Sequence, residues 1–349
     1  MARRIGLRDV ATKAGVSVTT VSHVLNNTPK ARINTETRQR VREAAQSLGY
    51  RADQLARGLR TATSGMIGLL TEEIAATPHA GRIILGAQET ARNHNLTMAI
   101  INSPLTNDAG ERTEDVRMLL DRRVDGIIYA TVYHDVVSPP DEMDQVPSVL
   151  IGALDRNRRI TSVIPDEQTG AVEAVRTLLA LGHRRIAFVA SAIDVPATRG
   201  RQAGYLEAMS EAGLAADPAL TASGDSDARG GYAAMNQILD TAPDVTGVFS
   251  YNDRMAMGIY RALADRGLDV LKDVSVVGFD DQDPIASGLF PGLTTIALPH
   301  YDMGVWAVET LIAEIGGAPS PTSVRLPCRL VARGSTAPAV ERRTARPGE

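Results

Sequence analysis

The sequence predicts a small all-α domain followed by an α/β region built from two parallel β-sheets. Apolar residues recur at helical spacing over the first 50 residues, and strand-like apolar runs alternate with helix-length segments after Gly65. The charge divides at the same place: residues 1–63 carry 12 Lys and Arg against four Asp and Glu, whereas the remainder carries 25 against 37. A small basic domain on a larger acidic one indicates that only the first part meets a polyanion.

The first two helices form a compact motif. Apolar residues spaced i, i+3, i+4 and i+7 mark a helix over 7–14, which Gly15 should end because glycine reaches left-handed backbone angles without steric cost. Ser17 can then cap a second helix, whose inward face begins at Val21. Two short helices joined by a tight turn with glycine form a helix-turn-helix, whose second helix enters the DNA major groove. The residues off its apolar face are small or polar: Val18, Thr19, Thr20, Ser22, His23 and Asn26.

A third amphipathic helix, capped near Asn34, precedes the α/β region. Seven or more strand-and-helix units exceed one compact sheet, so we expect two parallel sheets with a cleft between them. Ligands of open parallel sheets bind beyond the carboxyl ends of the strands, so contacts should lie just after strands. The expected strands are 65–71, 96–102, 125–131, 148–152, 185–190, 246–250 and 274–279, and the expected helices include 80–94, 110–123 and 167–181.

The composition excludes several other kinds of protein. The single cysteine, Cys328, excludes an internal disulfide and a cysteine-cluster zinc site. No apolar run reaches the roughly 18 residues that cross a bilayer, and the first residues lack the apolar stretch of a signal peptide, so we expect a cytoplasmic protein without a membrane partner. The sequence has no nucleophile elbow, phosphate-binding loop or His-Glu-x-x-His motif, so we expect no catalysis, no metal and no cofactor.

Further motifs follow the helix-turn-helix in a fixed order. They are Leu181-Gly-His183, Tyr251-Asn-Asp253, Val276-Val-Gly-Phe-Asp-Asp281 and Leu293-Thr-Thr-Ile296. Together with the first 60 residues, this ordered set closely resembles the lactose-repressor (LacI/GalR) family of bacterial transcription regulators. The resemblance implies a type I periplasmic-binding-protein-like domain, in which three crossover strands join two parallel-sheet subdomains.

The resemblance also implies a division of the chain. Residues 1–50 would form the helix-turn-helix headpiece, 51–63 a hinge helix or linker, 64–340 a ligand-binding and dimerisation domain, and 341–349 a tail. Within that domain, the first subdomain is expected over about 64–164 and 296–325, and the second over about 165–295 and 326–340.

By resemblance, Val18, Thr19 and His23 contact bases in the major groove. His23 stands where most relatives have arginine. Arginine reads guanine with two hydrogen bonds, whereas a neutral imidazole offers one donor, so we expect an altered or weaker preference at that base pair. Phosphate contacts would come from Thr20, Ser22 and Asn26.

The segment 53–60 resembles the family's hinge helix. Asp53 can cap it, and Leu59, with Ala56 on the same segment, falls where a leucine wedges into the minor groove and kinks the duplex. Eight residues that include Gly58 should be too short to stay helical alone, so we expect the hinge to fold when two subunits sit on DNA. A plain interdomain linker is the alternative.

The resemblance implies cleft residues that lie mostly after strands. The carboxylate of Asp253 can accept two hydroxyl hydrogen bonds, and the guanidinium of Arg201 can donate a fork of them to a sugar or a carboxylate. The alternatives are a helix cap for Asp253 and a surface ion pair for Arg201. Tyr133 and His134 follow a strand and could stack on a ligand ring. The residues expected to bind ligand are Arg201, Asp166, Asp253, Asp281, His79 and Tyr133.

These features predict a ligand-responsive transcription regulator that is not an enzyme. We expect a repressor that binds a palindromic operator as a homodimer, because one helix-turn-helix reads only half of a two-fold site. A small sugar-like effector would release it. One alternative is a co-repressor-dependent regulator of the same fold that responds to a nucleobase or another metabolite. A solute-binding protein without a DNA function is the alternative from another class.

Overall fold

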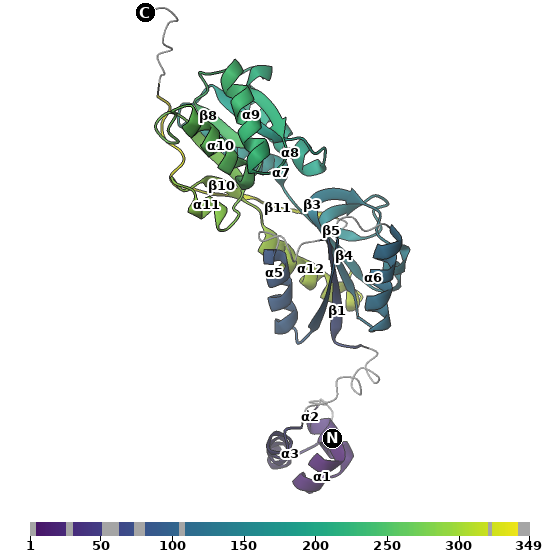
Figure 1. Cartoon of the computed structure of the whole chain (residues 1–349). Coiled ribbons are helices and arrows are strands. Elements are labelled where there is room, and N and C mark those ends of the chain that lie inside the picture. The colour runs from purple at the N-terminus through teal and green to yellow at the C-terminus, as the bar shows by residue number, and fades with distance from the viewer. Residues whose placement is uncertain are drawn as a thin grey trace, which may run out of the picture. The chain divides into compact units, whose positions relative to one another are not determined.

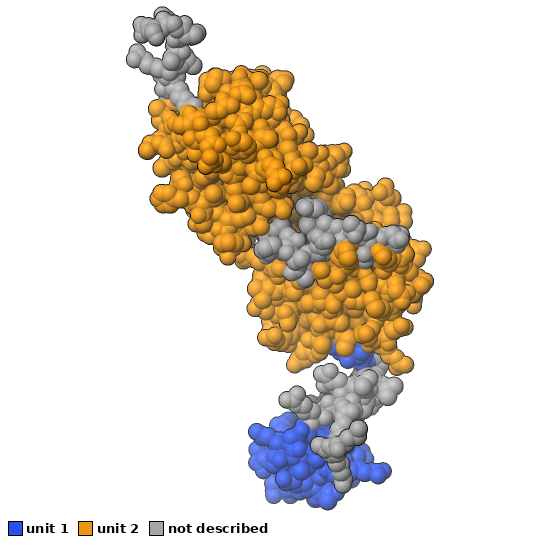
Figure 2. Space-filling view, viewed as in Figure 1, with its two compact units in different colours: residues 1–65 blue, residues 66–349 orange. Residues whose placement is uncertain are grey.

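The computed structural model describes residues 5–25, 31–50, 63–72, 81–104, 109–319 and 323–340. The chain forms two compact units, Met1–Gly65 and Met66–Glu349, which Figure 2 shows in different colours. The predicted hinge falls outside the described residues except for its last position.

The first unit is the three-helix domain that the apolar spacing predicts (Figure 1). Its helices are α1 (Leu7–Ala14), α2 (Val18–Leu25) and α3 (Thr35–Ser47). The guanidinium of Arg40 in α3 donates a hydrogen bond from Nε to the carbonyl of Ala14 at 3.0 Å, which ties the third helix to the end of the first. The core consists of small side chains from all three helices: Val10, Ala11, Ala14, Val21, Val24, Val41, Ala44 and Ala45.

Local chemistry fixes the ends of these helices. Gly15 ends α1 with φ at +63°, the left-handed conformation that glycine adopts without strain. Ser17 Oγ accepts a hydrogen bond from the backbone N–H of Thr20 at 3.1 Å, and Asn34 Oδ1 accepts one from Thr37 at 2.8 Å. The predicted stop and both predicted caps are confirmed, so the turn between α1 and α2 is determined by its own residues.

The first sheet of the second unit is entirely parallel. Its strands are β1 (Met66–Glu72), β2 (Thr97–Ser103), β3 (Ile127–Val137), β4 (Ser148–Asp155), β5 (Thr161–Pro165) and β11 (Ser323–Leu326), in the order β11-β5-β4-β3-β1-β2. Its helices are α5 (Gly81–Asn93), α6 (Ala109–Asp121) and α12 (His300–Ile315). Helices α5 and α12 lie on one side of this sheet and α6 on the other (Figure 1). Successive strand residues face these opposite sides: Leu69 packs with α5 and α12, and Leu70 packs with α6.

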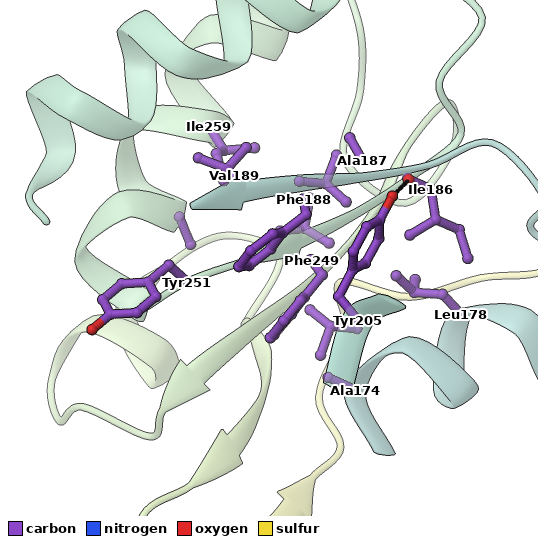
Figure 3. Packing of buried hydrophobic residues seen from close by; sticks show 14 of the residues in the cluster. Ala174, Leu178, Ile186, Ala187, Phe188, Val189, Tyr205, Phe249, Tyr251 and Ile259 are labelled. Atoms are coloured by element: carbon purple, nitrogen blue, oxygen red, sulfur yellow. Dashed lines mark hydrogen bonds between the residues drawn. The ribbon is translucent and has the colours of Figure 1, made fainter. Parts of the chain in front are cut away.

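The second sheet is parallel except at one edge, where β10 and β12 run antiparallel. Its strands are β6 (Ile186–Ser191), β7 (Thr221–Gly224), β8 (Gly247–Ser250), β9 (Ser275–Asp280), β10 (Thr294–Ala297) and β12 (Arg329–Val331), in the order β12-β10-β9-β8-β6-β7. Its helices are α7 (Glu167–Ala180), α8 (Pro196–Glu211), α9 (Ala228–Thr241), α10 (Asp253–Asp265) and the short α11 (Ile285–Gly288). Aromatic rings fill its core, where Phe188 stacks on Phe249 and Tyr205 with centroids 5.1 Å and 5.3 Å away (Figure 3).

The chain crosses between the two sheets three times within the described residues. The crossings run from β5 to α7, from β10 to α12 and from β11 to β12. The seven predicted strands and three predicted helices are confirmed. The structure adds the strands β5, β7, β10, β11 and β12, each only three to five residues long, which is too short to show an alternating pattern.

Helices α7 and α8 approach closely because Gly204 has no side chain. A Cβ at this position would lie 2.3 Å from the carbonyl oxygen of Gln168 and 2.7 Å from the Cβ of Ala171. Backbone of one helix thus packs directly on backbone of the other, which brings the first turn of α7 beside α8.

Gly204→Ala should lower the free energy of unfolding by about 1–3 kcal/mol, because the new methyl group forces the two helices apart. The sign of this change in stability is informative, since alanine in a helix interior is otherwise favoured over glycine by about 1 kcal/mol. Thermal and urea unfolding followed by circular dichroism measure the effect. Gly288→Ala is the matched control, because a Cβ there meets no atom within 4 Å. A Gly204→Ala protein as stable as the parent would contradict the packing described.

Candidate DNA-binding surface and ligand cleft

The outward face of α2 carries the residues predicted to contact DNA. Val18 is 40% exposed and Thr19 is exposed, whereas Thr20, Ser22 and His23 are half-buried. The described part of this face is therefore small, mostly polar and accessible, as close approach to base edges requires. Three further predicted contacts lie outside the described residues: Asn26, Ala56 and Leu59.

A cleft in the second unit lies at the carboxyl ends of strands from both sheets. It encloses about 530 Å³ of empty space, including its opening to solvent. Its position is the one expected for the ligand site of parallel sheets. Six of its polar residues matter below: His134, Glu167, Arg201, Asn252, Arg254 and Asp280.

Arg201, on the first turns of α8, is buried at the centre of a charged cluster. Its Nε donates to Glu167 Oε2 at 2.7 Å, and its second terminal nitrogen lies 3.2 Å from Asp280 Oδ1. Its other terminal nitrogen donates to the backbone carbonyl of Tyr251. The guanidinium carbon also lies 4.5 Å from the ring centroid of Tyr251 and 3.8 Å from that of Phe279. The structure thus gives Arg201 a buried ion cluster in the cleft and excludes the surface ion pair.

The cluster fixes the charge of its arginine. Burial alone would lower the pKa of Arg201, but the carboxylates of Glu167 and Asp280 outweigh burial and raise the pKa above its ordinary value. A permanently charged, flat donor therefore stands at the cleft wall.

The turn after β9 directs its two acidic side chains to different places. Asp280 and Asp281 have φ of +108° and +52°, angles that residues with a side chain rarely adopt. Asp280 reaches Arg201, whereas Asp281 forms an ion pair with Arg333 at 2.7 Å. Strained backbone of this kind concentrates at functional sites, because the surrounding structure must hold it.

Asp253, one of the predicted ligand contacts, is fully buried and does not line the cleft. Its Oδ1 accepts a hydrogen bond from the Thr295 hydroxyl at 2.6 Å, and its Oδ2 accepts one from the backbone N–H of Gln282 at 2.7 Å. The first bond joins α10 to β10, and the second joins α10 to the turn that follows β9. The preceding residue, Asn252, lines the cleft and caps α10 by accepting from Met255.

The other predicted ligand contacts are placed as follows. Asp166 caps α7, accepting from the N–H of Thr169 at 3.3 Å, and is not among the residues that line the cleft. Asp281 lines a neighbouring pocket rather than the cleft. Tyr133 lies within β3, and His79 falls outside the described residues.

Of the cleft-lining residues, only Arg201 was among the predicted ligand contacts, and the four that matter most among those missed are Glu167, Asn252, Arg254 and Asp280. All four directly adjoin residues that were predicted, because the turns after strands were located correctly. The side-chain direction within each turn depends on backbone angles such as those at Asp280, which no motif reports.

The described residues contain neither a membrane-spanning helix nor a cluster of metal-binding side chains. No helix in them is long and apolar enough to cross a membrane. They also contain no group of three or more His, Cys, Asp or Glu side chains that could hold a metal ion.

Known protein families match both units. Residues 6–53 match "Bacterial regulatory proteins, lacI family", and residues 175–336 match "Periplasmic binding protein-like domain". The first match covers the helix-turn-helix, and the second covers most of the second sheet with its helices. A DNA-binding family therefore accounts for the headpiece, and a solute-binding protein without a DNA function is excluded.

Individual relatives match over nearly the whole chain. The HTH-type transcriptional regulator RegA of Clostridium saccharobutylicum is 34% identical over 309 residues, 88% of this chain and 91% of the relative. The solved lac repressor dimer bound to operator and the anti-inducer ONPF shares 28% identity, with a TM-score of 0.78 over 96% of this chain and 100% of that one. The complex of the transcriptional regulator CelR with cellobiose shares 29% identity, with a TM-score of 0.67 over 95% and 100%.

The transcription regulators of the family that matches residues 6–53 are not enzymes. The chain has a helix-turn-helix headpiece and two α/β subdomains with a cleft between them, and a regulator 34% identical to it matches about nine-tenths of its length. The chain therefore belongs to the LacI family of ligand-responsive, DNA-binding transcription regulators.

Proposed function

We propose that this protein is a repressor that binds a palindromic operator as a homodimer in the cytoplasm, and that a small sugar-like effector releases it. One observation carries the proposal: the chain joins an accessible recognition helix to a separate unit whose cleft holds a buried, charged cluster around Arg201. The relatives support it, since one is a repressor dimer on its operator and another is a complex with cellobiose.

On the DNA side, α2 would lie in the major groove. Val18 and Thr19 are the most accessible of its predicted base-reading residues, and His23 follows one turn later. The basic headpiece would supply the electrostatic part of the affinity, which does not depend on sequence. Two headpieces are needed for a two-fold site, with Ala56 and Leu59 of each hinge contributing at its centre.

On the effector side, Arg201 would be the main donor. Its contacts with Glu167, Asp280 and Tyr251 use part of the five N–H donors of a guanidinium, so the remaining ones can meet a ligand. Asn252 and Asp280 lie beside it as polar lining. We therefore propose these residues as contacts and assign Asp253 the role of positioning the turn that carries Asp280.

Effector binding would act through the two subdomains. The cleft is lined by elements of both sheets, so a ligand that contacts both favours one arrangement of the subdomains over another. It shifts the equilibrium only by the difference in its affinity for the two arrangements, typically about 1–3 kcal/mol. The hinges would transmit that shift to the headpieces.

Selection of bound duplexes from a random pool by the full-length protein tests the DNA side. We expect a roughly palindromic site. His23→Ala should relax selection at one base pair of each half-site by about 1 kcal/mol, since a single hydrogen bond discriminates less than a bidentate pair. Thr12→Ala, which removes an exposed hydroxyl from α1, should leave the selected site unchanged. If no DNA sequence is enriched, with or without a co-repressor, the operator-binding proposal is wrong.

Arg201→Lys tests the effector side. The ammonium group of lysine lacks the planar fork that can contact Glu167, Asp280 and a ligand together. The effector concentration that releases the selected operator should therefore rise about tenfold or more. Operator affinity without effector should persist. Candidate effectors come from a thermal-shift screen of sugars and nucleobases. Arg176→Lys is the matched control, because Arg176 pairs with Glu211 on the exposed side of the same two helices. An unchanged response in Arg201→Lys would refute this role.

The raised pKa of Asp253 predicts that the stability of the protein depends on pH. Burial, followed by the nearby charge of Asp280, raises the pKa of Asp253 to about 8, whereas an unfolded Asp titrates near about 3.9. Between these values the folded protein keeps a proton that the unfolded chain has lost, so stability falls as pH rises through this window.

Asp253→Asn should remove that decline and leave the variant relatively more stable at pH 8, because an amide matches the protonated acid and the Thr295 hydroxyl can accept from its NH₂. Urea unfolding across this pH range measures the difference. Asp121→Asn, an exposed carboxylate at the end of α6, serves as the control. Parallel pH profiles for the parent and Asp253→Asn would argue against a proton held at this site.

A further inference from the structure

Two side chains of the cleft have buried polar atoms without a partner. The Nε of Arg254 and both ring nitrogens of His134 are shielded from solvent, yet they form no hydrogen bond within the described part of the chain. An unsatisfied buried donor or acceptor costs about 1–3 kcal/mol, so such groups are rare unless something else satisfies them. Their position in the wall of a ligand cleft suggests that a ligand does so.

Arg254 differs from Arg201 in having no acidic partner. The side chain of Arg201 is engaged by Glu167 and Asp280, so those two carboxylates are already committed. No ion pair joins Arg254 to an acid among the residues described. Arg254 is therefore the guanidinium that can take an anionic group from outside.

The charges that act on the pKa of His134 come from Arg325 on β11, from Arg201 and Arg199 on α8, and from Asp135 beside it. Arg201 is balanced by Glu167 and Asp280, and Arg199 pairs with Asp194, so Arg325 is the one of these arginines without an ion pair among the described residues. Burial first, and then Arg325 and Arg201, lower the pKa of His134 to about 4. The imidazole is thus neutral at physiological pH, and each of its ring nitrogens can take part in a hydrogen bond with a ligand.

The two unsatisfied groups come from opposite sides of the cleft. His134 lies on β3 of the first sheet, and Arg254 lies in the first turn of α10, which packs on the second sheet. A ligand group held by both would bridge the subdomains, which is the arrangement that links binding to subdomain closure.

We propose that the effector carries an acidic group, a carboxylate or a phosphate, which lies between His134 and Arg254 and is bound by both. This inference rests on the proposed function, because it concerns the effector of the same cleft. Hydrogen bonds from a guanidinium to an anion are roughly twice as strong as neutral ones, and the anion also supplies the counter-ion that Arg254 does not find among the described residues. A neutral hydroxyl would satisfy the donors but leave Arg254 without a counter-ion.

The proposal has a thermodynamic consequence. An anion beside His134 opposes the effect of the neighbouring arginines and raises the pKa of the imidazole, so binding takes up a proton. Affinity should then rise as pH falls, by up to about tenfold per unit between the pKa values of the bound and free protein.

Nuclear magnetic resonance of the full chain with ¹³C-labelled histidine tests the acidic subsite directly. Sulfate and acetate serve as probes for a phosphate and a carboxylate, against chloride at equal ionic strength. The His134 signal is assigned by its loss in His134→Gln. We expect a saturable shift of that signal and a raised pKa with at least one probe. Both effects should disappear in Arg254→Gln and persist in Arg122→Gln, which removes an exposed positive charge at the end of α6.

The probes separate the possible results. A response to sulfate alone indicates a phosphate ester, and a response to acetate alone indicates a carboxylate. The absence of any response to either probe overturns the proposal, as does a response that Arg254→Gln leaves intact.

A second measurement separates this inference from the proposed function. Release of the selected operator is compared for D-glucose, D-glucose 6-phosphate and D-glucuronate in the parent and in Arg254→Gln. If D-glucose releases both proteins equally well, the sugar-effector function stands and the acidic effector is wrong. Release by an acidic sugar in the parent, weakened at least tenfold in Arg254→Gln, supports both. The resonance experiment decides the subsite whether or not any of these sugars acts.

Discussion

The ion cluster of Arg201 with Glu167 and Asp280 is the interaction on which the architecture of the cleft depends. It joins the start of α7, the start of α8 and the end of β9 in one buried contact. Taking these charges out of water is costly, and the loss of one partner from such a cluster typically costs about 3–5 kcal/mol because it leaves another charge unpaired. The cluster therefore favours the arrangement in which all three elements are in place at the cleft wall.

Other features of the fold serve this contact. The close crossing of α7 and α8 at Gly204 sets the two helix starts at the distance that Glu167 and Arg201 require. The rings of Tyr251 and Phe279 enclose the guanidinium and exclude water, which strengthens its electrostatic contacts. The strained turn at Asp280 supplies the last carboxylate. Helix packing, aromatic packing and backbone strain thus converge on one side chain.

The sequence predicts the elements better than it predicts the site. Periodicity identified both units, and local chemistry at Gly15, Ser17 and Asn34 fixed the helix ends. The family resemblance implied that Arg201 lies in the cleft, but its buried partner Glu167 is distant in sequence and gave no local signal. Residue pairs such as Asn252 and Asp253 are alike in type and adjacent, and only the backbone geometry of the turn decides which one lines the cleft.

The charge of the second unit makes the unpaired arginine of the cleft, Arg254, more informative. Residues 64–349 carry 25 basic and 37 acidic side chains, so the unit as a whole does not attract anions. At physiological ionic strength charges are screened over about 8 Å, so the acidic exterior has little influence on a group inside the cleft. There the charged lining consists of Arg201, which Glu167 and Asp280 balance, and of Arg254, which has no acidic partner among the described residues. An unpaired guanidinium in this position adds nothing to the stability of the fold, which is why we propose that a ligand contacts Arg254.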